Sequence, residues 1–515
     1  MADKYDLIVI GAGNGGLMTA CRASQLGLKV LVLERHNLPG GAATSFVRGR
    51  FEFEASLHEI PNFGTGEENN RLTQIFSELG IDVDMIRTKD AFRYVIENDN
   101  ERSLDVTLPN GRDKVLRFFE EHYPGDVNAV EDLFAAAEDV ARGLEYYGLT
   151  RGRPDPEILK KEHKNFMKIM PMTAAELFRE LGMSNECFDL LTAYWPYVGV
   201  DIETVDATRY ILLLYSYLIT GAFVPKMRSH QLSTAIAERA CELGCRILYE
   251  TEVTKILTHA GAVKGVQTAD GRIFESTAVA SNAFPEIVYS KLLDDRSVVP
   301  AYERKKTNAR KYGFRSVCVY LGLDAPPEEL GINDYSVYIS TTADSAAIYN
   351  ESKTRNGKEF SLDVCCLNIE VPDCSPEGTT ELVLTRSYTA DAWADVTEAD
   401  YVKTKRRVAD EMISDLERIM GYKIREHIEE IEIATPITFA RYMGSPQGTI
   451  YGYESQKWDG MAARTLSEGM EQTVPGLFFT GGHGAALSGY YPTYTYGDRT
   501  AYKIMGYVMG GGRNE

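Results

Sequence analysis

The ten residues LIVIGAGNGG at positions 7–16 decide the fold of this chain. The four apolar residues predict a buried parallel strand. Gly11, Gly13 and Gly16 follow in the G-x-G-x-x-G spacing, where such a strand gives way to a helix. The first glycine permits a tight turn, the second lets a pyrophosphate approach the backbone, and the third lets helix and strand pack closely. Because the start of the helix offers free N–H groups and a positive dipole end, the stretch predicts a dinucleotide site.

A second apolar run, residues 30–33, is followed by Glu34, about twenty residues beyond the glycines. A carboxylate at this place can accept hydrogen bonds from a ribose and disfavours the additional phosphate of NADP. The glycine motif alone is weak evidence, but here strand, glycines, helix, second strand and acid occur in order. A further glycine turn, Gly40-Gly41, would let backbone approach a ligand that lies across the first turn; the alternative is an ordinary loop.

Composition limits the function classes. The chain has 515 residues, enough for two or three domains, and a formal net charge of −20, which argues against a nucleic-acid partner. Eight cysteines form no C-x-x-C pair, so we expect a reducing, cytoplasmic environment and no metal site. The chain starts without a signal peptide, and no run approaches the ~18 apolar residues of a spanning helix. Contact of residues 210–224 with a membrane surface stays open.

The rest of the chain alternates between helix-like and strand-like sequence. Residues 126–218 are typical of helices, and residues 245–282 of strands that resume the nucleotide-binding part. The strand-like residues 316–387 then suggest a return to a second domain. Asn110-Gly111 is a strong hairpin signal.

Further motifs point to a family. The stretch FEASLH at positions 53–58 resembles an F-D-x-G motif, in the form that carries a histidine at the place of His58. Across its whole length the chain resembles the phytoene desaturase, carotenoid isomerase and retinol saturase family of FAD-dependent oxidoreductases, and the histidine form is that of retinol saturase. The other matching stretches are 197–200, 251–253, 281–283, 372–378, 435–436, 448–452 and 478–481.

The resemblance implies an α/β fold, with a glutathione-reductase-like, Rossmann-type FAD domain and an α+β substrate domain. The implied FAD domain comprises residues 1–90, 225–285 and 465–515, and the substrate domain comprises 91–224 and 286–464. The implied cofactor is FAD. The residues expected at the FAD site are Gly11, Gly13, Asn14, Gly15, Gly16, Glu34, Arg35, Gly40, Gly41, Ala42, Val253, Asn282, Gly481, Gly482, Tyr491, Pro492 and Thr493.

The chain departs from the family pattern where substrate would meet cofactor. Glu54 and Ser56 replace the usual aspartate and glycine, and residues 226–230 (KMRSH) replace a G-G-M-type turn. Residues 490–496 are rich in tyrosine, whereas the family pattern has a glycine-rich, apolar sequence at this place. Carotenoid desaturation therefore cannot simply be carried over.

Tyrosine and histidine suggest a proton donor. Hydride transfer at flavin N5 to a C=C bond also needs a proton for the second carbon, and both side chains can supply one. The candidates are His58, His483, Tyr490, Tyr491 and Tyr494. They favour a reductase, or an isomerase that uses reduced flavin. The alternative is that the tyrosines bond the flavin rim or seal the domain interface.

Three functions are compatible with these sequence features. The first is an FAD enzyme that adds or removes hydrogen at C=C bonds of an apolar, lipid-like or polyene substrate. The second is a redox-neutral isomerase, and the third is a flavin-binding protein without turnover. An amine oxidase shares the nucleotide site, but nothing beyond that site argues for an amine substrate. Because no second G-x-G-x-x-G follows a strand, we expect an external electron donor or acceptor in place of an NAD(P) domain. Oligomeric state is open.

Overall fold

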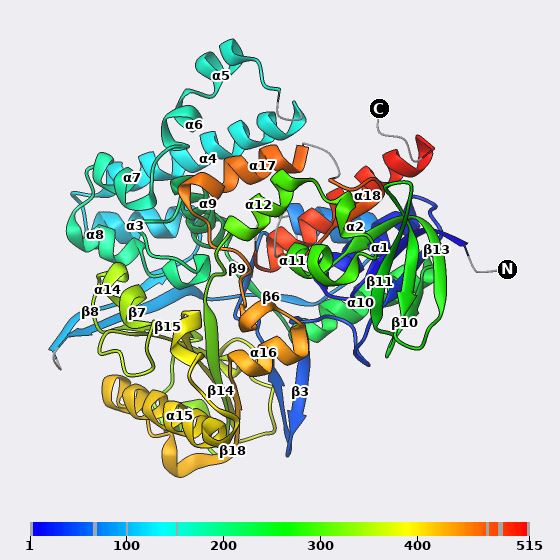
Figure 1. The fold of residues 1–515 in the computed structure, drawn as a ribbon. Coiled ribbons are helices and arrows are strands. Elements are labelled where there is room, and N and C mark those ends of the chain that lie inside the picture. The colour runs from blue at the N-terminus through cyan, green and yellow to red at the C-terminus, as the bar shows by residue number, and fades with distance from the viewer. Residues whose placement is uncertain are drawn as a thin grey trace.

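The computed structural model describes residues 4–64, 70–98, 101–150, 153–469, 473–482 and 488–511. Two seven-stranded sheets form its frame, and helices lie around both (Figure 1). Among the described helices, none combines the length and the apolar character needed to cross a bilayer.

The first sheet is built around β1 (Lys4–Ile10). It pairs in parallel with β2 (Val30–Leu33) on one side and with β13 (Ile273–Ser281) on the other. Ile10 is paired with the last residue of both neighbours, so three carboxyl ends meet at one edge. In open α/β sheets ligands bind at such an edge. The remaining strands of the order β10-β2-β1-β13-β12-β11, with β19 beside β13, are β10 (Arg246–Leu248), β11 (Val253–His259), β12 (Ala262–Thr268) and β19 (Leu477–Phe479).

Helices cover one face of this sheet. Because side chains alternate along a strand, Leu7 and Val9 pack with these helices, whereas Ile8 and Ile10 pack on the opposite face. Two helices cross very closely: a Cβ on Gly497 would lie 2.6 Å from the carbonyl oxygen of Gly15. Position 497 therefore has no room for a side chain at this crossing. The helices are α1 (Asn14–Gln25), α2 (Arg71–Leu79), α10 (Arg228–Glu242) and α18 (Tyr490–Met509).

The second sheet has the order β18-β14-β17-β16-β15-β7-β8. Its neighbouring strands pair in antiparallel fashion, except β15 and β7, which are parallel. One face packs against α15 (Glu398–Met420), which contributes Val408, Met412 and Leu416 to a buried cluster. The strands are β7 (Asp90–Asn98), β8 (Glu101–Pro109), β14 (Arg315–Leu323), β15 (Ser336–Ser340), β16 (Ser361–Cys366), β17 (Thr380–Tyr388) and β18 (Ile428–Ala434).

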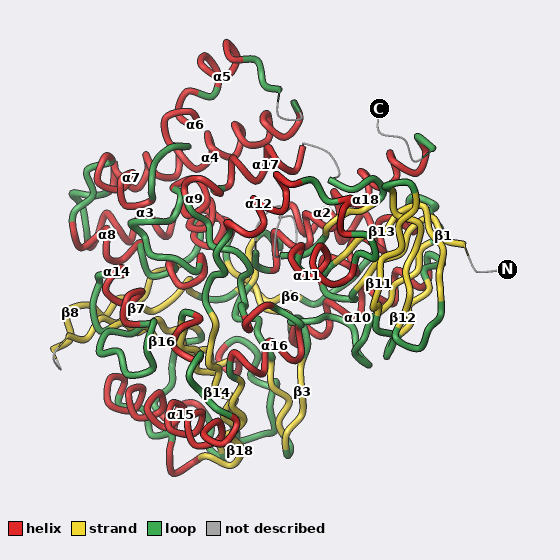
Figure 2. The backbone as a smooth tube through the Cα atoms, viewed as in Figure 1, coloured by secondary structure: helices red, strands yellow, loops and turns green. Residues whose placement is uncertain are grey.

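A group of helices follows β8 and packs around Phe119, Phe134 and Tyr210. Figure 2 shows them gathered away from the first sheet. They are α3 (Arg112–His122), α4 (Val127–Leu149), α5 (Pro156–Glu162), α6 (Lys164–Ile169), α7 (Ala174–Glu180), α8 (Asn185–Leu191) and α9 (Ala207–Tyr215), which a π-helical turn, Ser216–Thr220, continues. The smaller elements include β3 (Ser45–Arg48), β4 (Phe51–Glu54), β5 (Ile60–Pro61), β6 (Met85–Arg87), β9 (Ala222–Pro225), α11 (Pro285–Ile287), α12 (Ala301–Ala309), α13 (Pro327–Leu330), α14 (Ser345–Glu351), α16 (Pro436–Met443) and α17 (Met461–Gly469).

The prediction of a hairpin at Asn110-Gly111 is wrong. The two residues lead from β8 into α3, because the Asn110 amide donates 2.7 Å to the carbonyl oxygen of Thr88 and the backbone of Gly111 donates to Leu218. Gly111 has a φ of +100°, which turns the chain into the helix. The domain boundaries expected from the resemblance stay a prediction, although the first sheet does combine residues 4–33, 246–281 and 477–479.

Candidate active site

A cavity of about 550 Å³ reaches from the carboxyl edge of the first sheet to the second sheet. Gly11, Gly13 and Glu34 line it at the first sheet, and Asp363 on β16 lines it at the second. One side of α9 and the start of α18 complete the wall. The cavity therefore holds both the predicted nucleotide site and residues of the expected substrate region.

Glu34 is fixed at the end of β2 by backbone donors. Its carboxylate accepts hydrogen bonds from the backbone of Ala12 at 2.6 Å and of His36 at 2.8 Å. It is only partly buried and lines the cavity, so its remaining acceptor capacity faces the position predicted for a ribose.

The two glycine turns pack against each other. The backbone of Gly40 donates 2.7 Å to the carbonyl oxygen of Ala12, and Gly13 and Gly40 form a parallel bridge. A Cβ on Gly13 would lie 2.4 Å from the Asn282 amide nitrogen, and one on Gly41 would lie 3.3 Å from the Cα of Gly13. Of the two alternatives for Gly40-Gly41, this geometry favours a turn that brings backbone to a ligand.

Two buried polar atoms beside these turns lack partners in the described structure. They are the side-chain oxygens of Asn14 and Asn282, and both residues line the cavity. Buried polar atoms without partners are costly, and a bound ligand that donates hydrogen bonds would relieve them. Together with the partly buried Glu34 carboxylate and the backbone of the two glycine turns, they fit a dinucleotide such as FAD.

Fourteen of the residues expected at the FAD site line the cavity: Gly11, Gly13, Asn14, Glu34, Arg35, Gly40, Gly41, Ala42, Val253, Asn282, Gly482, Tyr491, Pro492 and Thr493. Within the described chain, Gly15, Gly16 and Gly481 lie outside this lining. A Cβ on Gly15 would lie 2.3 Å from the nitrogen of Gly481, and one on Gly16 would lie 2.1 Å from the oxygen of Gly11. These glycines permit close packing, as the motif predicts for Gly16.

The candidate proton donors separate into three groups. His58, Tyr490 and Tyr491 line the cavity. Tyr494 is fully buried outside that lining, as far as the described residues show, and its ring packs edge-on against Phe76 at 5.8 Å. His483 lies outside the described residues.

Burial leaves the cavity-lining candidates poorly suited to release a proton at pH 7. It lowers the pKa of His58 to about 4, so the imidazole is neutral at pH 7 and carries no spare proton. Its Nδ1 lies 3.4 Å from the Tyr197 hydroxyl. Burial raises the pKa of Tyr490 and of Tyr491 above the usual tyrosine value. Neutral tyrosine hydroxyls with raised pKa values donate hydrogen bonds well but release protons poorly.

Glu59 was not among the predicted site residues. It lines the cavity next to His58 and is 4% exposed. Burial raises its pKa to about 8, so the carboxyl is protonated at pH 7. The Tyr194 hydroxyl donates to Oε1 at 3.2 Å, whereas Oε2 has no partner in the described structure. In the sequence Glu59 stands in a stretch that mixes polar and apolar residues, 57–63, which gave no signal that its side chain is buried.

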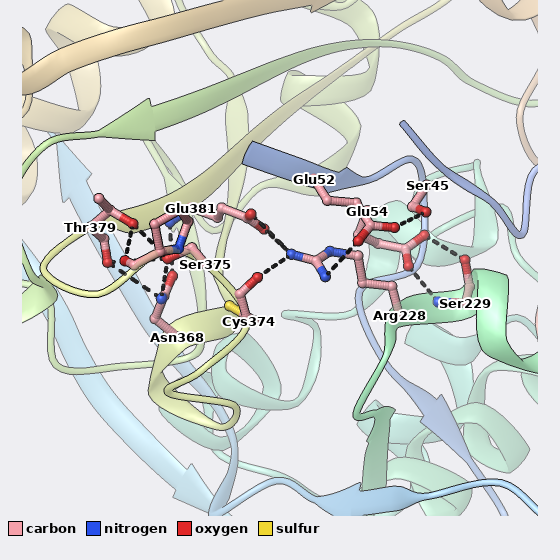
Figure 3. A network of polar contacts seen from close by, with 11 residues as sticks. Ser45, Glu52, Glu54, Arg228, Ser229, Asn368, Cys374, Ser375, Thr379 and Glu381 are labelled. Carbon is pink, nitrogen blue, oxygen red and sulfur yellow. Dashed lines mark hydrogen bonds and ion pairs between the residues drawn. The ribbon is translucent and has the colours of Figure 1, made fainter. Parts of the chain in front are cut away.

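The departures from the family pattern contact one another (Figure 3). Glu54 accepts hydrogen bonds from the backbone and the hydroxyl of Ser229, both at 2.7 Å, at the start of α10. Arg228 binds both carboxylate oxygens of Glu381 at 2.9 Å and the carbonyl oxygen of Cys374 at 2.6 Å. Its φ of +64° lies in the left-handed region that favours glycine. The network joins α10 to the second sheet.

The chain was compared with known proteins. The family model described as flavin containing amine oxidoreductase matches residues 15–501. The chain belongs to this family. It is 23% identical to all-trans-retinol 13,14-reductase from Danio rerio, over 87% of this chain and 78% of that protein. It is also 23% identical to the chloroplastic prolycopene isomerase from Daucus carota, over 87% and 72%. The crystal structure of an oxidoreductase from Methanosarcina mazei shares the fold, with a TM-score of 0.65, 16% identity, and 97% and 100% coverage.

These findings confirm several predictions. The resemblance to the carotenoid and retinol enzymes is confirmed, as is the α/β fold with a Rossmann-type FAD part. The chain is an enzyme, an FAD-dependent oxidoreductase or isomerase, and its cofactor is FAD. The roles of individual residues stay predictions.

Replacing Glu34 tests the ribose position. We expect Glu34→Arg to weaken FAD binding about ten- to hundredfold, because a charged acceptor worth roughly 1.5–3 kcal/mol is lost. The measurement is bound flavin per polypeptide across an FAD titration. Glu275→Arg, on an exposed position of β13 in the same sheet, is the control and should bind FAD normally. Unchanged FAD binding by Glu34→Arg would show that the ribose lies elsewhere.

Proposed function

We propose that this enzyme saturates a C=C bond of an apolar, polyene or lipid-like substrate. The observation that carries the proposal is Glu59, a buried and protonated acid on the wall of the cavity that holds the nucleotide motif. The names of the relatives, a retinol 13,14-reductase and a prolycopene isomerase, support a polyene substrate. The apolar side chains Leu212, Leu213 and Val224 on the cavity wall suit such a molecule.

FAD, when bound, supplies a hydride for one carbon of the double bond. The second carbon needs a proton, which we assign to Oε2 of Glu59. Tyr194 holds the other carboxyl oxygen, so the acid proton is oriented by the protein before substrate arrives. The carboxylate that remains after transfer is reprotonated from solvent. Two electrons from an external donor and two protons thus enter each product.

The other residues take supporting roles in this proposal. Glu34 and the turns at Gly13 and Gly40 hold the nucleotide. The neutral imidazole of His58 and the hydroxyl of Tyr490 orient substrate or flavin through hydrogen bonds, in place of the proton-donor role first expected of them. Tyr490 is itself positioned by Ser56, whose hydroxyl lies 2.9 Å from its own.

A redox-neutral isomerase is the second candidate, supported by the similarity to prolycopene isomerase. Electron counting separates the two. The test incubates anaerobically reduced enzyme with retinol or a carotene in deuterated water. Saturation predicts two electrons consumed per double bond and deuterium at both carbons of the former double bond, because the N5–H of reduced flavin exchanges with solvent. An unchanged electron count with shifted double bonds would establish the isomerase instead.

A further inference from the structure

Arg209 is a buried cation on the cavity wall. It is 5% exposed, and its Nη2 donates 2.8 Å to the hydroxyl of Ser488. Its Nη1 is buried and has no hydrogen-bond partner in the described structure. Nor does its guanidinium form an ion pair with any described carboxylate, in contrast to Arg228 on the same wall, which binds Glu381.

The described groups around Arg209 do not neutralise the charge of its guanidinium. The nearby carboxylate of Asp206 is already used, by the backbone of Arg209 at 3.1 Å, the Thr208 hydroxyl at 2.5 Å and the Ser455 hydroxyl at 2.8 Å. Burial, and then the second buried cation Arg464, lower the pKa of Arg209 to about 10, so it stays charged at pH 7. An unpaired buried charge is expensive, and a ligand that brings a negative charge offsets that cost.

The helix that carries Arg209 also indicates the length and the polarity of the ligand. Arg209, Leu212, Leu213 and Ser216 lie at helical positions i, i+3, i+4 and i+7 and all line the cavity. Seven residues of helix span about 10 Å. The wall thus runs from a cation, over two leucines, to Tyr217, whose hydroxyl donates 3.4 Å to the carbonyl oxygen of Glu59. A matching ligand is apolar along its length and anionic at one end.

We infer that the substrate carries a carboxylate, which Arg209 binds with the Ser488 hydroxyl as a second donor. The substrate class is an unsaturated apolar acid, a polyene acid or an unsaturated fatty acid, with the carboxylate at the Arg209 end of α9. The double bond in this substrate rests on the proposed function, whereas the binding of its carboxylate by Arg209 does not. Charge-assisted hydrogen bonds of this kind contribute a factor of about ten to a hundred in affinity.

The test compares retinoic acid with retinol and methyl retinoate on the reduced holoenzyme. We expect the wild type to prefer the acid and Arg209→Gln to raise KM for the acid about ten- to hundredfold. KM for retinol and for the ester should not change, and Arg209→Lys should restore part of the preference. Arg142→Gln, on the exposed side of α4, is the control. Equal use of acid, alcohol and ester by the wild type would overturn the inference, whether or not the variants fold.

Two further readouts separate the causes of failure. If Arg209→Gln shifts the flavin spectrum or its redox potential and slows all three substrates equally, Arg209 serves the cofactor and the inference is wrong. The oxidised holoenzyme is also titrated with a saturated fatty acid, which cannot react. Arg209-dependent binding of that acid without turnover of any polyene would support the carboxylate site and contradict the proposed function.

Discussion

Glu59→Gln should slow saturation of the double bond about 10²- to 10⁴-fold, the usual contribution of a positioned general acid. Glutamine keeps the shape of the side chain and still accepts the hydrogen bond from Tyr194, but it has no proton to release. We therefore expect unchanged FAD content and unchanged substrate binding, with the loss confined to kcat. Single-turnover mixing of reduced enzyme with a polyene measures this step directly.

The same residue predicts a pH profile. Because burial raises the pKa of Glu59 to about 8, the acid form predominates below that pH and is lost above it. The rate of saturation should be level near pH 7 and fall as pH rises through about 8, and Glu59→Gln should remove this fall. Glu370→Gln is the comparison: Glu370 lies outside the described cavity lining, but its charge raises the pKa of Glu59, so this variant should keep the fall and move it to lower pH. A profile unaltered by Glu59→Gln would assign the proton to another group.

Asp498→Ala should lower the free energy of unfolding by about 3–5 kcal/mol. Asp498 on α18 is 1% exposed and accepts a 2.5 Å hydrogen bond from Nε of Arg22 on α1, which is 3% exposed. Removing the carboxylate leaves a buried guanidinium without its buried counter-ion, at the crossing of the two helices. Denaturant unfolding of the holoenzyme measures the loss.

Glu78→Gln provides the comparison for that variant. Glu78 binds the same guanidinium through Nη2 at 2.8 Å, but its side chain is 50% exposed. Solvent screens such a pair, so the expected loss is below about 1 kcal/mol. Equal destabilisation by the two variants would contradict the view that the buried pair with Asp498 fastens α18 to α1.

The nucleotide-binding part could be predicted because its determinants are local. Strand, glycines, helix and Glu34 are contiguous in the sequence, and each glycine acts through its own backbone. The prediction of a hairpin at Asn110-Gly111 was wrong for the opposite reason. Thr88 and Leu218, which are distant in sequence, accept hydrogen bonds from these two residues where the chain turns into α3. A local turn signal says nothing of such partners.

The chemistry of the site depended on burial, which the sequence does not show. His58 and the tyrosines carry familiar proton-transfer groups, yet burial leaves His58 neutral at pH 7 and raises the pKa of Tyr490, so neither releases a proton readily. Glu59 and Arg209 resemble ordinary surface residues in sequence. They become candidates only because residues from separate segments enclose them and leave Oε2 of one and Nη1 of the other without partners in the described structure.

The central claim is that reduced FAD in this enzyme passes its electrons to a C=C bond. The most direct test reduces the purified holoenzyme anaerobically, mixes it with polyenes, unsaturated fatty acids and enones, and follows the flavin spectrum together with the products. The account predicts that one of these classes reoxidises the flavin, with one double bond saturated per flavin. A flavin that stays reduced with every class, or a protein that takes up no FAD, would contradict it.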